Sequence, residues 1–382
     1  MTHTYITAFM TAGRAMHKLS LLVIACLLVC TYTASAQNNG TVKEVATAVP
    51  MLRIAPDTRA AALGETGMAT SPDAASGMLN PAKLVFTKDE NAFMVDYAPW
   101  LRDITSGSYL LSLAGYQKID EKQAVSASIR YFNAGKVEER DYNNTLVQLV
   151  TPHELAVDVA YSRLLSDKFS VAAAFRYVRS SLGQTVTNSS TGAGGALLAD
   201  IAAYYNGTNE EGKGLTAGLI IANIGSAKIS YGQDNGNNGF VPARIGAGVA
   251  YTLPLEEDHK LMLAADFNKS LVPEIPAGDN GMAKYLDYGV MQSYGEGFSN
   301  GALSISAGAE YLYRQLLAVR AGYFTESEVY GGRKYLSAGF GVFYKKLAFN
   351  FAYIVPSGNG TDRNALSNSI RFGLCFFPKR SI

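Results

Sequence analysis

Residues 154–180 read ELAVDVAYSRLLSDKFSVAAAFRYVRS, and this stretch decides the fold. Large apolar residues fall on every second position before residue 165 and again after residue 168, with mostly small or polar residues between them. Such period-two alternation is typical of a β-strand whose two faces meet different surroundings. The connection LSDK between the two halves is short enough for a tight turn between antiparallel strands. The stretch therefore predicts a β-hairpin with one apolar face.

The same alternation recurs through the chain after about residue 90. We predict fourteen strands of about ten residues each. They are expected at 91–98, 106–116, 122–132, 154–164, 168–180, 195–205, 214–224, 241–252, 259–269, 303–313, 315–325, 335–344, 346–355 and 367–377. Connections after even-numbered strands are short, whereas most of those after odd-numbered strands are long, such as 133–153 and 270–302. This asymmetry is typical of outer-membrane barrels, which have short periplasmic turns and long extracellular loops.

The composition agrees with a barrel in the outer membrane. The chain contains 37 Gly, 23 Tyr and 17 Phe, and no apolar run of 18 residues follows residue 36. A helical membrane span needs about 20 such residues, whereas strands with alternating faces cross without them. We therefore predict an all-β fold, a 14-stranded antiparallel transmembrane β-barrel over residues 91–377 with a tail at 378–382. Both barrel ends are expected in the periplasm, and a soluble β-sandwich is the alternative.

The start of the chain has the features of a secretory signal peptide. Arg14 and Lys18 precede the apolar run LSLLVIACLLVC, which the small residues of TYTASA follow. We expect residues 1–36 to be cleaved off. Cys375 is then the single remaining cysteine, so no internal disulfide is expected. The remaining 31 basic and 32 acidic residues nearly balance, which argues against nucleic acid as a partner.

Residues 37–90 are rich in small side chains, as in RAAALGETGMATSPDAASGMLNPAKL at 59–84. These side chains are too small to build a core of their own and too apolar for an ordinary solvated linker. The predicted inward faces of the strands are also small. They carry only occasional charged or amide side chains, namely Arg130, Asp158, Arg176, Asp266 and Asn350. We therefore expect the N-terminal segment to enter the lumen of the barrel and plug it.

No combination of residues predicts catalysis, a cofactor or a metal. His153 and His259 are the histidines that follow residue 36, and the predicted topology places them at opposite ends of the barrel, where they cannot share a metal. The sequence GFSNG at 297–301 matches a nucleophile motif with Ser299 at its centre, but it lies in a Gly-rich loop rather than at a strand–turn–helix elbow. We predict that the protein is not an enzyme.

The connection 270–302 is far longer than a hairpin needs and carries many apolar residues. Long connections with their own apolar content are usually functional, and Met with aromatic side chains suits a protein-binding surface or a lid. A loop that simply seals the barrel mouth explains the pattern equally well. The candidate cargo- or partner-binding residues are Met282, Tyr285, Leu286, Tyr288, Met291 and Tyr294.

The stretch from residue 59 to residue 84 resembles the opening signature of the PorV/PorQ family of type IX secretion system proteins of Bacteroidota, which are FadL-like outer-membrane barrels. In that signature an Arg-Ala run ending in Gly leads through small residues to Asn-Pro-Ala. The matching residues are Arg59, Leu63, Gly64, Gly67, Asp73, Asn80, Pro81 and Ala82. The sequence APWLR at 98–102 and the chain length are closer to the PorV (LptO) branch. The five residues PKRSI after Phe377 depart from barrels that end on an aromatic residue.

The resemblance implies an outer-membrane shuttle. Such a protein binds the C-terminal signal domains of secreted cargo, collects them at a large outer-membrane translocon and delivers them to a sortase-containing attachment complex. Cargo would be held by the extracellular loops, and membrane lipid would surround the wall. Two alternatives stay open. One is a FadL-type transporter of hydrophobic small molecules, which would need an apolar lumen pocket and a lateral gap. The other is a lipopolysaccharide-modifying protein, which would need a set of Ser, His and acid.

Overall fold

A computed structural model describes residues 45–100, 107–141, 143–181, 192–231, 238–256, 258–355 and 369–379. The predicted signal peptide lies outside the described residues. None of the helices in these ranges is both long and apolar enough to cross a membrane.

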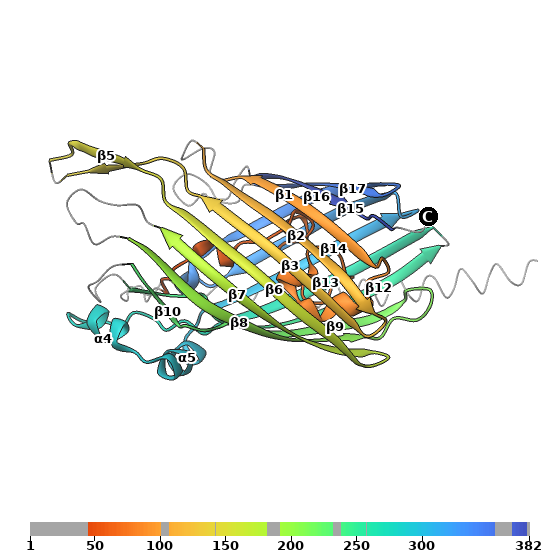
Figure 1. The fold of residues 1–382 in the computed structure, drawn as a ribbon, viewed down its shortest axis with the longest axis horizontal. Helices are drawn as coiled ribbons and strands as arrows, with labels where there is room; N and C mark the ends of the chain where they lie inside the picture. Colours follow the sequence, from red (N-terminus) through yellow and green to blue (C-terminus); the bar gives the residue numbers. More distant parts are fainter. Residues whose placement is uncertain are drawn as a thin grey trace, which may run out of the picture. The chain divides into compact units, whose positions relative to one another are not determined.

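Fourteen antiparallel strands form a closed barrel, as the alternation predicted (Figure 1). They are β1 (Asn91–Pro99), β2 (Tyr109–Asp120), β3 (Gln123–Asn133), β6 (His153–Ser166), β7 (Phe169–Ser181), β8 (Ala193–Asn206), β9 (Gly214–Gly225), β12 (Arg244–Glu256), β13 (His259–Ser270), β14 (Leu303–Tyr313), β15 (Leu317–Glu326), β16 (Lys334–Tyr344), β17 (Leu347–Val355) and β18 (Ile370–Phe376). The barrel closes where β1 pairs with β18, with Phe93 opposite Phe376.

The strand ends differ from the prediction by a few residues. The largest differences are at the ends of β2 and β12, each four residues later than expected, while β2, β12 and β18 each begin three residues later. At the start of β12 the cause is visible, because Pro242 has no N–H to donate to a ladder and Val241 donates instead to Ala227 within the same connection.

The connections divide the barrel into two ends. Short turns join the strands at one end, which we call the turn end, and the long connections lie at the other, the loop end. Contrary to the expectation of plain loops, the long connections contain structure of their own. They hold two small hairpins, β4 (Val137–Arg140) with β5 (Leu146–Val150) and β10 (Lys228–Ser230) with β11 (Asn238–Phe240). They also hold helices α4 (Gly281–Asp287), α5 (Val290–Ser299) and η5 (Glu328–Tyr330).

The wall has an apolar outer face and a small, polar inner face. Phe175 and Leu197 point outward and are 67% and 68% exposed, whereas their neighbours Ala174 and Leu198 are buried inside. The predicted inward residues Arg130, Asp158, Arg176, Asp266 and Asn350 are all buried. An outward apolar face is the surface that lipid requires, because hydrocarbon solvates no charge.

The segment that precedes β1 lies against the inner face of the wall. It forms four short helices, η2 (Pro50–Arg53), α2 (Thr58–Ala62), α3 (Ser76–Leu79) and η3 (Pro81–Phe86). Figure 1 shows them, in red and orange, between the strands of the barrel. Asp57 caps α2 by accepting from the Ala60 N–H, and Asn80 caps η3, where Pro81 has no N–H to satisfy.

This segment runs from one end of the barrel to the other. At the loop end the Val45 N–H donates to the Val329 carbonyl at 2.8 Å. At the turn end the Tyr116 hydroxyl donates to the Asp89 carbonyl, two residues before β1 begins. The chain therefore enters the first strand at the turn end after crossing the full lumen.

Candidate functional site

The residues of the N-terminal signature hold the segment to the wall. Arg59 makes two hydrogen bonds to Glu310 of β14, at 2.9 and 2.7 Å, and one to Asp73 at 2.8 Å. Glu310 also accepts from Arg320 of β15 at 2.6 Å. Because these charges have little access to water, each one depends on its partner, and removing one partner would leave a buried charge uncompensated.

Two signature glycines lie where an added side chain would meet close neighbours, backbone at Gly64 and a flexible side chain at Gly67. Gly64 has φ +66°, and a Cβ there would lie 2.5 Å from the Tyr323 backbone nitrogen. The Gly67 N–H donates to Asp266 of β13 at 2.7 Å, and a Cβ on Gly67 would lie 2.8 Å from the side chain of Leu79. Leu63, between Ala62 and Gly64, is fully buried in a small cluster with Met262. Backbone and wall are therefore in direct contact here.

The last part of the signature joins the segment to β7 and β8. The Asn80 amide donates to the carbonyls of Met68 and Ala203, and its oxygen accepts from the Ala82 N–H. The Ala82 carbonyl in turn accepts from Ser170 of β7 at 2.6 Å. Pro81 starts η3 between them. Arg59, Leu63, Gly64, Gly67, Asn80 and Ala82 thus contact the barrel wall directly. The resemblance to the family signature singled out these positions.

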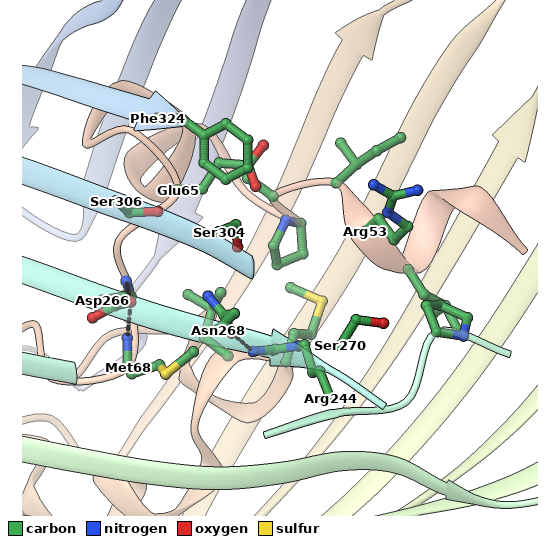
Figure 2. Close-up of a pocket in the computed structure, with 18 of the residues that line it drawn as sticks. Arg53, Glu65, Met68, Arg244, Asp266, Asn268, Ser270, Ser304, Ser306 and Phe324 are labelled. Carbon is green, nitrogen blue, oxygen red and sulfur yellow. Dashed lines mark hydrogen bonds between the residues drawn. The ribbon is translucent and has the colours of Figure 1, made fainter. Parts of the chain in front are cut away.

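Cavities remain in the lumen beside the N-terminal segment. One cavity of about 90 Å³ is bounded by the N-terminal segment and the wall, and Figure 2 shows the side chains around it. Arg130, Arg244 and Asp266 line it. The Asp266 Oδ1, Ser306 Oγ and Arg130 Nε atoms are buried with no hydrogen-bond partner in the described chain. Buried polar atoms around a cavity of this size are normally satisfied by ordered water.

A second cavity, of about 380 Å³, lies on the turn-end side of the segment. Its lining mixes charged residues, such as Asp73, Asp96 and Lys260, with apolar ones, such as Leu312 and Phe377. Most of its exposed lining is apolar, as in ordinary small-molecule sites, but charged side chains interrupt it. Among the described residues, no group of three or more His, Cys, Asp and Glu is placed to hold a metal ion.

At the loop end, four of the six candidate binding residues turn inward. Tyr285, Leu286, Tyr288 and Tyr294 pack into a cluster with residues of the neighbouring connections, including Phe240. The Tyr285 ring meets Phe240 edge-on at 4.8 Å, and its hydroxyl donates to the Ala46 carbonyl at 2.8 Å. Burial raises the pKa of Tyr285, so this hydroxyl stays protonated and available as a donor. These residues build the loop end rather than present a surface.

The exposed apolar side chains of α4 and α5 form a different set. Met282 and Met291, which the sequence singled out, are 52% and 80% exposed. Val290 and Phe298 join them at 45% and 64%, although the sequence analysis did not select them as binding residues. We call these four residues, Met282, Val290, Met291 and Phe298, the apolar helix surface.

Helix α5 explains why this set differs from the prediction. Ser293 and Gly297 are four residues apart and form its buried face, whereas Met291 and Phe298 are seven apart on another face. A Cβ on Gly297 would lie 2.0 Å from the Leu271 carbonyl oxygen, so the helix rests directly on the end of β13. The seven-residue spacing of Met291 and Phe298, which is two turns of a helix, was the signal in the sequence that could have identified Phe298.

The two residues of the possible catalytic pair form separate hydrogen bonds. Ser299 is the last residue of α5, not part of a loop as expected, and its hydroxyl donates to the Glu296 carbonyl at 2.9 Å. The His153 ring lies at the start of β6, where Nδ1 is 3.2 Å from the Thr151 carbonyl. The helix ends at Ser299 instead of beginning there, which is the reverse of a nucleophile elbow.

A family model described as type IX secretion system protein PorV matches residues 35–277. The chain belongs to the PorV family. That match spans the signature, the N-terminal segment and the first part of the barrel, so the resemblance read from the sequence is confirmed. A comparison with curated protein sequences found no match.

Solved structures with the same fold include two toluene transporters and a FadL homologue. The toluene transporter TbuX of Ralstonia pickettii is 15% identical, with a TM-score of 0.54 over 84% of this chain and 97% of its own. The toluene transporter TodX of Pseudomonas putida is 12% identical, with a TM-score of 0.53 over 88% and 98%. A FadL homologue of Pseudomonas aeruginosa is 12% identical, with a TM-score of 0.50 over 87% and 99%. At this identity the likeness shows the fold alone. The PorV family member therefore has the fold of a FadL-like barrel.

Proposed function

We propose that this PorV family member is an outer-membrane shuttle of type IX secretion. It binds the C-terminal signal domains of secreted cargo at the loop end and carries them from the translocon to the sortase-containing attachment complex. The family match supports secretion as the process. The observation that carries the proposed binding step is the apolar helix surface, where Met291 is 80% and Phe298 is 64% exposed.

The proposed binding surface is held rigidly. Helix α5 contacts the Leu271 backbone through Gly297, and the Tyr294 hydroxyl accepts from the Gly225 N–H at 3.0 Å. A surface that is already ordered loses less conformational entropy when it binds. Exposed Met and Phe side chains suit a site that must accept related but non-identical domains, because Met adapts its shape readily. The same features favour a partner surface over a lid.

The orientation follows from the barrel's asymmetry. We place the loop end at the cell surface, the turn end and both barrel ends in the periplasm, and the apolar outer wall in membrane lipid. In this orientation the apolar helix surface faces cargo that has already left the cell. The predicted signal peptide would direct export to the outer membrane.

The contents of the lumen favour a surface role over transport through the barrel. The N-terminal segment bonds to strands on several sides of the wall, from Asp266 of β13 to Ser170 of β7. The smaller cavity beside it is lined by charged groups, among them Arg130, Arg244 and Asp266. A transporter of hydrophobic molecules needs an apolar pocket instead. Cargo signal domains would therefore bind outside the barrel, while the lumen stays filled.

The binding step can be tested with a double variant, Met291→Ser with Phe298→Ser. Binding of a purified cargo signal domain to the detergent-solubilised barrel is expected to weaken by about tenfold or more, because each exposed side chain contributes on the order of 1 kcal/mol or more when buried. The matched control is Gln292→Ala with Ser299→Ala, which removes exposed polar groups from the same helix and should leave the affinity unchanged. Unchanged affinity in the double variant, with the barrel still heat-modifiable on gels, would contradict the proposed surface.

A further inference from the structure

The chain between Val45 and Arg53 ties three long connections together at the loop end. The Val45 N–H donates to Val329, in the connection between β15 and β16, and the Ala48 N–H donates to Phe240, between β9 and β12, both at 2.8 Å. The Ala46 carbonyl accepts from Tyr285 of α4, between β13 and β14. We call residues 45–53 the tie.

The tie is packed tightly. Val45, Val49 and Met51 are buried, and a Cβ on Gly239 would lie 2.8 Å from the Ala48 Cβ. Val49 has φ +52°, a left-handed conformation that is unfavourable for a β-branched residue. Such strain persists only where the surrounding contacts impose it. The tie is therefore an integral, well-packed part of the loop end.

The tie continues without a break into the lumen. The Met51 N–H donates to Glu154 at the start of β6, and Arg53 donates to Glu326 at 3.2 Å while its guanidinium stacks 3.7 Å from the Tyr330 ring centre. Four residues later Asp57 begins the helix that carries Arg59. One continuous segment thus connects the wall contacts of the signature with the underside of α4.

We propose that the tie positions the apolar helix surface and that the tie itself lies on the cell-surface side of the barrel. The tie acts through Tyr285 and touches no cargo itself. The link to cargo rests on the proposed function, whereas the position of the tie does not. In this arrangement the N-terminal segment has two roles. It fills the lumen, and at the loop end it holds α4 in place for a partner.

The positioning role is tested by Tyr285→Phe, with Tyr288→Phe as the matched control. Tyr285→Phe keeps the ring against Phe240 but removes the hydrogen bond to Ala46. The Tyr288 hydroxyl has no hydrogen-bond partner among the described residues and its ring packs in the same cluster. Amide hydrogen exchange in residues 281–299 should become about two- to tenfold faster in Tyr285→Phe, because one hydrogen bond contributes about 0.5–1.5 kcal/mol. Exchange in the barrel strands should not change. Equal exchange in both variants would overturn the positioning role.

The position of the tie is tested by labelling of single cysteines in intact cells. On a Cys375→Ser background, Ala46→Cys places a thiol on an exposed residue of the tie, and Lys379→Cys places one at the turn end. A membrane-impermeant maleimide should label Ala46→Cys in intact cells and Lys379→Cys only after lysis, with the Cys375→Ser parent unlabelled. Labelling of Ala46→Cys only after lysis would overturn the surface placement.

The positioning role of the tie and the proposed cargo site can fail separately. Cargo affinity measured on the same Tyr285→Phe protein should fall together with the faster exchange. Faster exchange with no cargo binding in any variant would leave the tie in place and refute the proposed cargo site. Intact cargo binding with equal exchange in Tyr285→Phe and Tyr288→Phe would support the cargo site and refute the tie.

Discussion

At the scale of single residues, small side chains let the backbone of the N-terminal segment lie directly against the backbone of the inner wall. The inner wall carries Gly308 and Gly322 opposite Leu63 and Gly64, and an added Cβ on Gly322 would lie 2.1 Å from the Gly64 nitrogen. Small residues on both sides let the backbone of the N-terminal segment reach the backbone of the wall. The abundance of Ala and Gly in residues 59–84 indicated this from the sequence, although the exact opposing pairs did not follow from it.

Gly64→Ala is expected to loosen the N-terminal segment. The new Cβ would lie 2.5 Å from the Tyr323 nitrogen in a left-handed backbone conformation, so backbone atoms must move. We expect a loss of several kcal/mol in the stability of the segment, because strain and overpacking add. The measurement is amide exchange of residues 57–70. Gly289→Ala, where nothing lies within 4 Å, is the control, and equal exchange in both proteins would refute the close-approach argument.

At the scale of elements, the strands follow from local alternation but the helices of the loop end do not. A strand needs only a period of two, which any ten residues can display. Helix α5 has a sequence, VMQSYGEGFS, that contains two glycines and no side-chain cap, so propensity alone argues against it. Packing on the end of β13 stabilises it instead. Sequence reasoning therefore predicted a loop where the structure has a helix.

Gly297→Ala and Gly295→Ala provide a matched pair on that helix. A Cβ on Gly297 would lie 2.0 Å from the Leu271 carbonyl, whereas a Cβ on Gly295 meets nothing within 4 Å. Gly297→Ala should detach α5 and speed limited proteolysis within residues 271–302. Gly295→Ala should slow it slightly, since Ala favours a helix by about 1 kcal/mol over Gly. The reverse order of cleavage rates would show that α5 does not depend on its contact with β13.

At the scale of the whole molecule, the barrel and its filling form one structure. Arg59 contacts Glu310, which is 251 positions away in the sequence, and Glu65 forms an ion pair with Arg333 at 3.4 Å. These pairs bring charges from the N-terminal segment to the inner wall, where few water molecules can screen them. The inner wall therefore carries charged residues at the places where it pairs with charged residues of the N-terminal segment.

Arg59→Leu is expected to weaken the attachment of the segment by about 1–3 kcal/mol, because Asp73 and Glu310 lose a shared partner in a partly buried site, although Glu310 keeps Arg320. The readout is the denaturant concentration at which residues 57–84 become accessible to protease. Arg140→Leu, which breaks an exposed ion pair with Glu138, should change this by less than about 1 kcal/mol. A similar small effect for both variants would mean that the segment is held by packing alone.

The sequence by itself determined the number of barrel strands, the alternation of their faces and the two unlike ends of the barrel. These properties depend on local period and connection length, which a chain displays residue by residue. Tertiary structure alone decided that Tyr285 turns inward to Ala46 while Phe298 turns outward, and which wall residue meets Arg59. Those outcomes depend on contacts between residues up to hundreds of positions apart, and such contacts exist only once the barrel has closed.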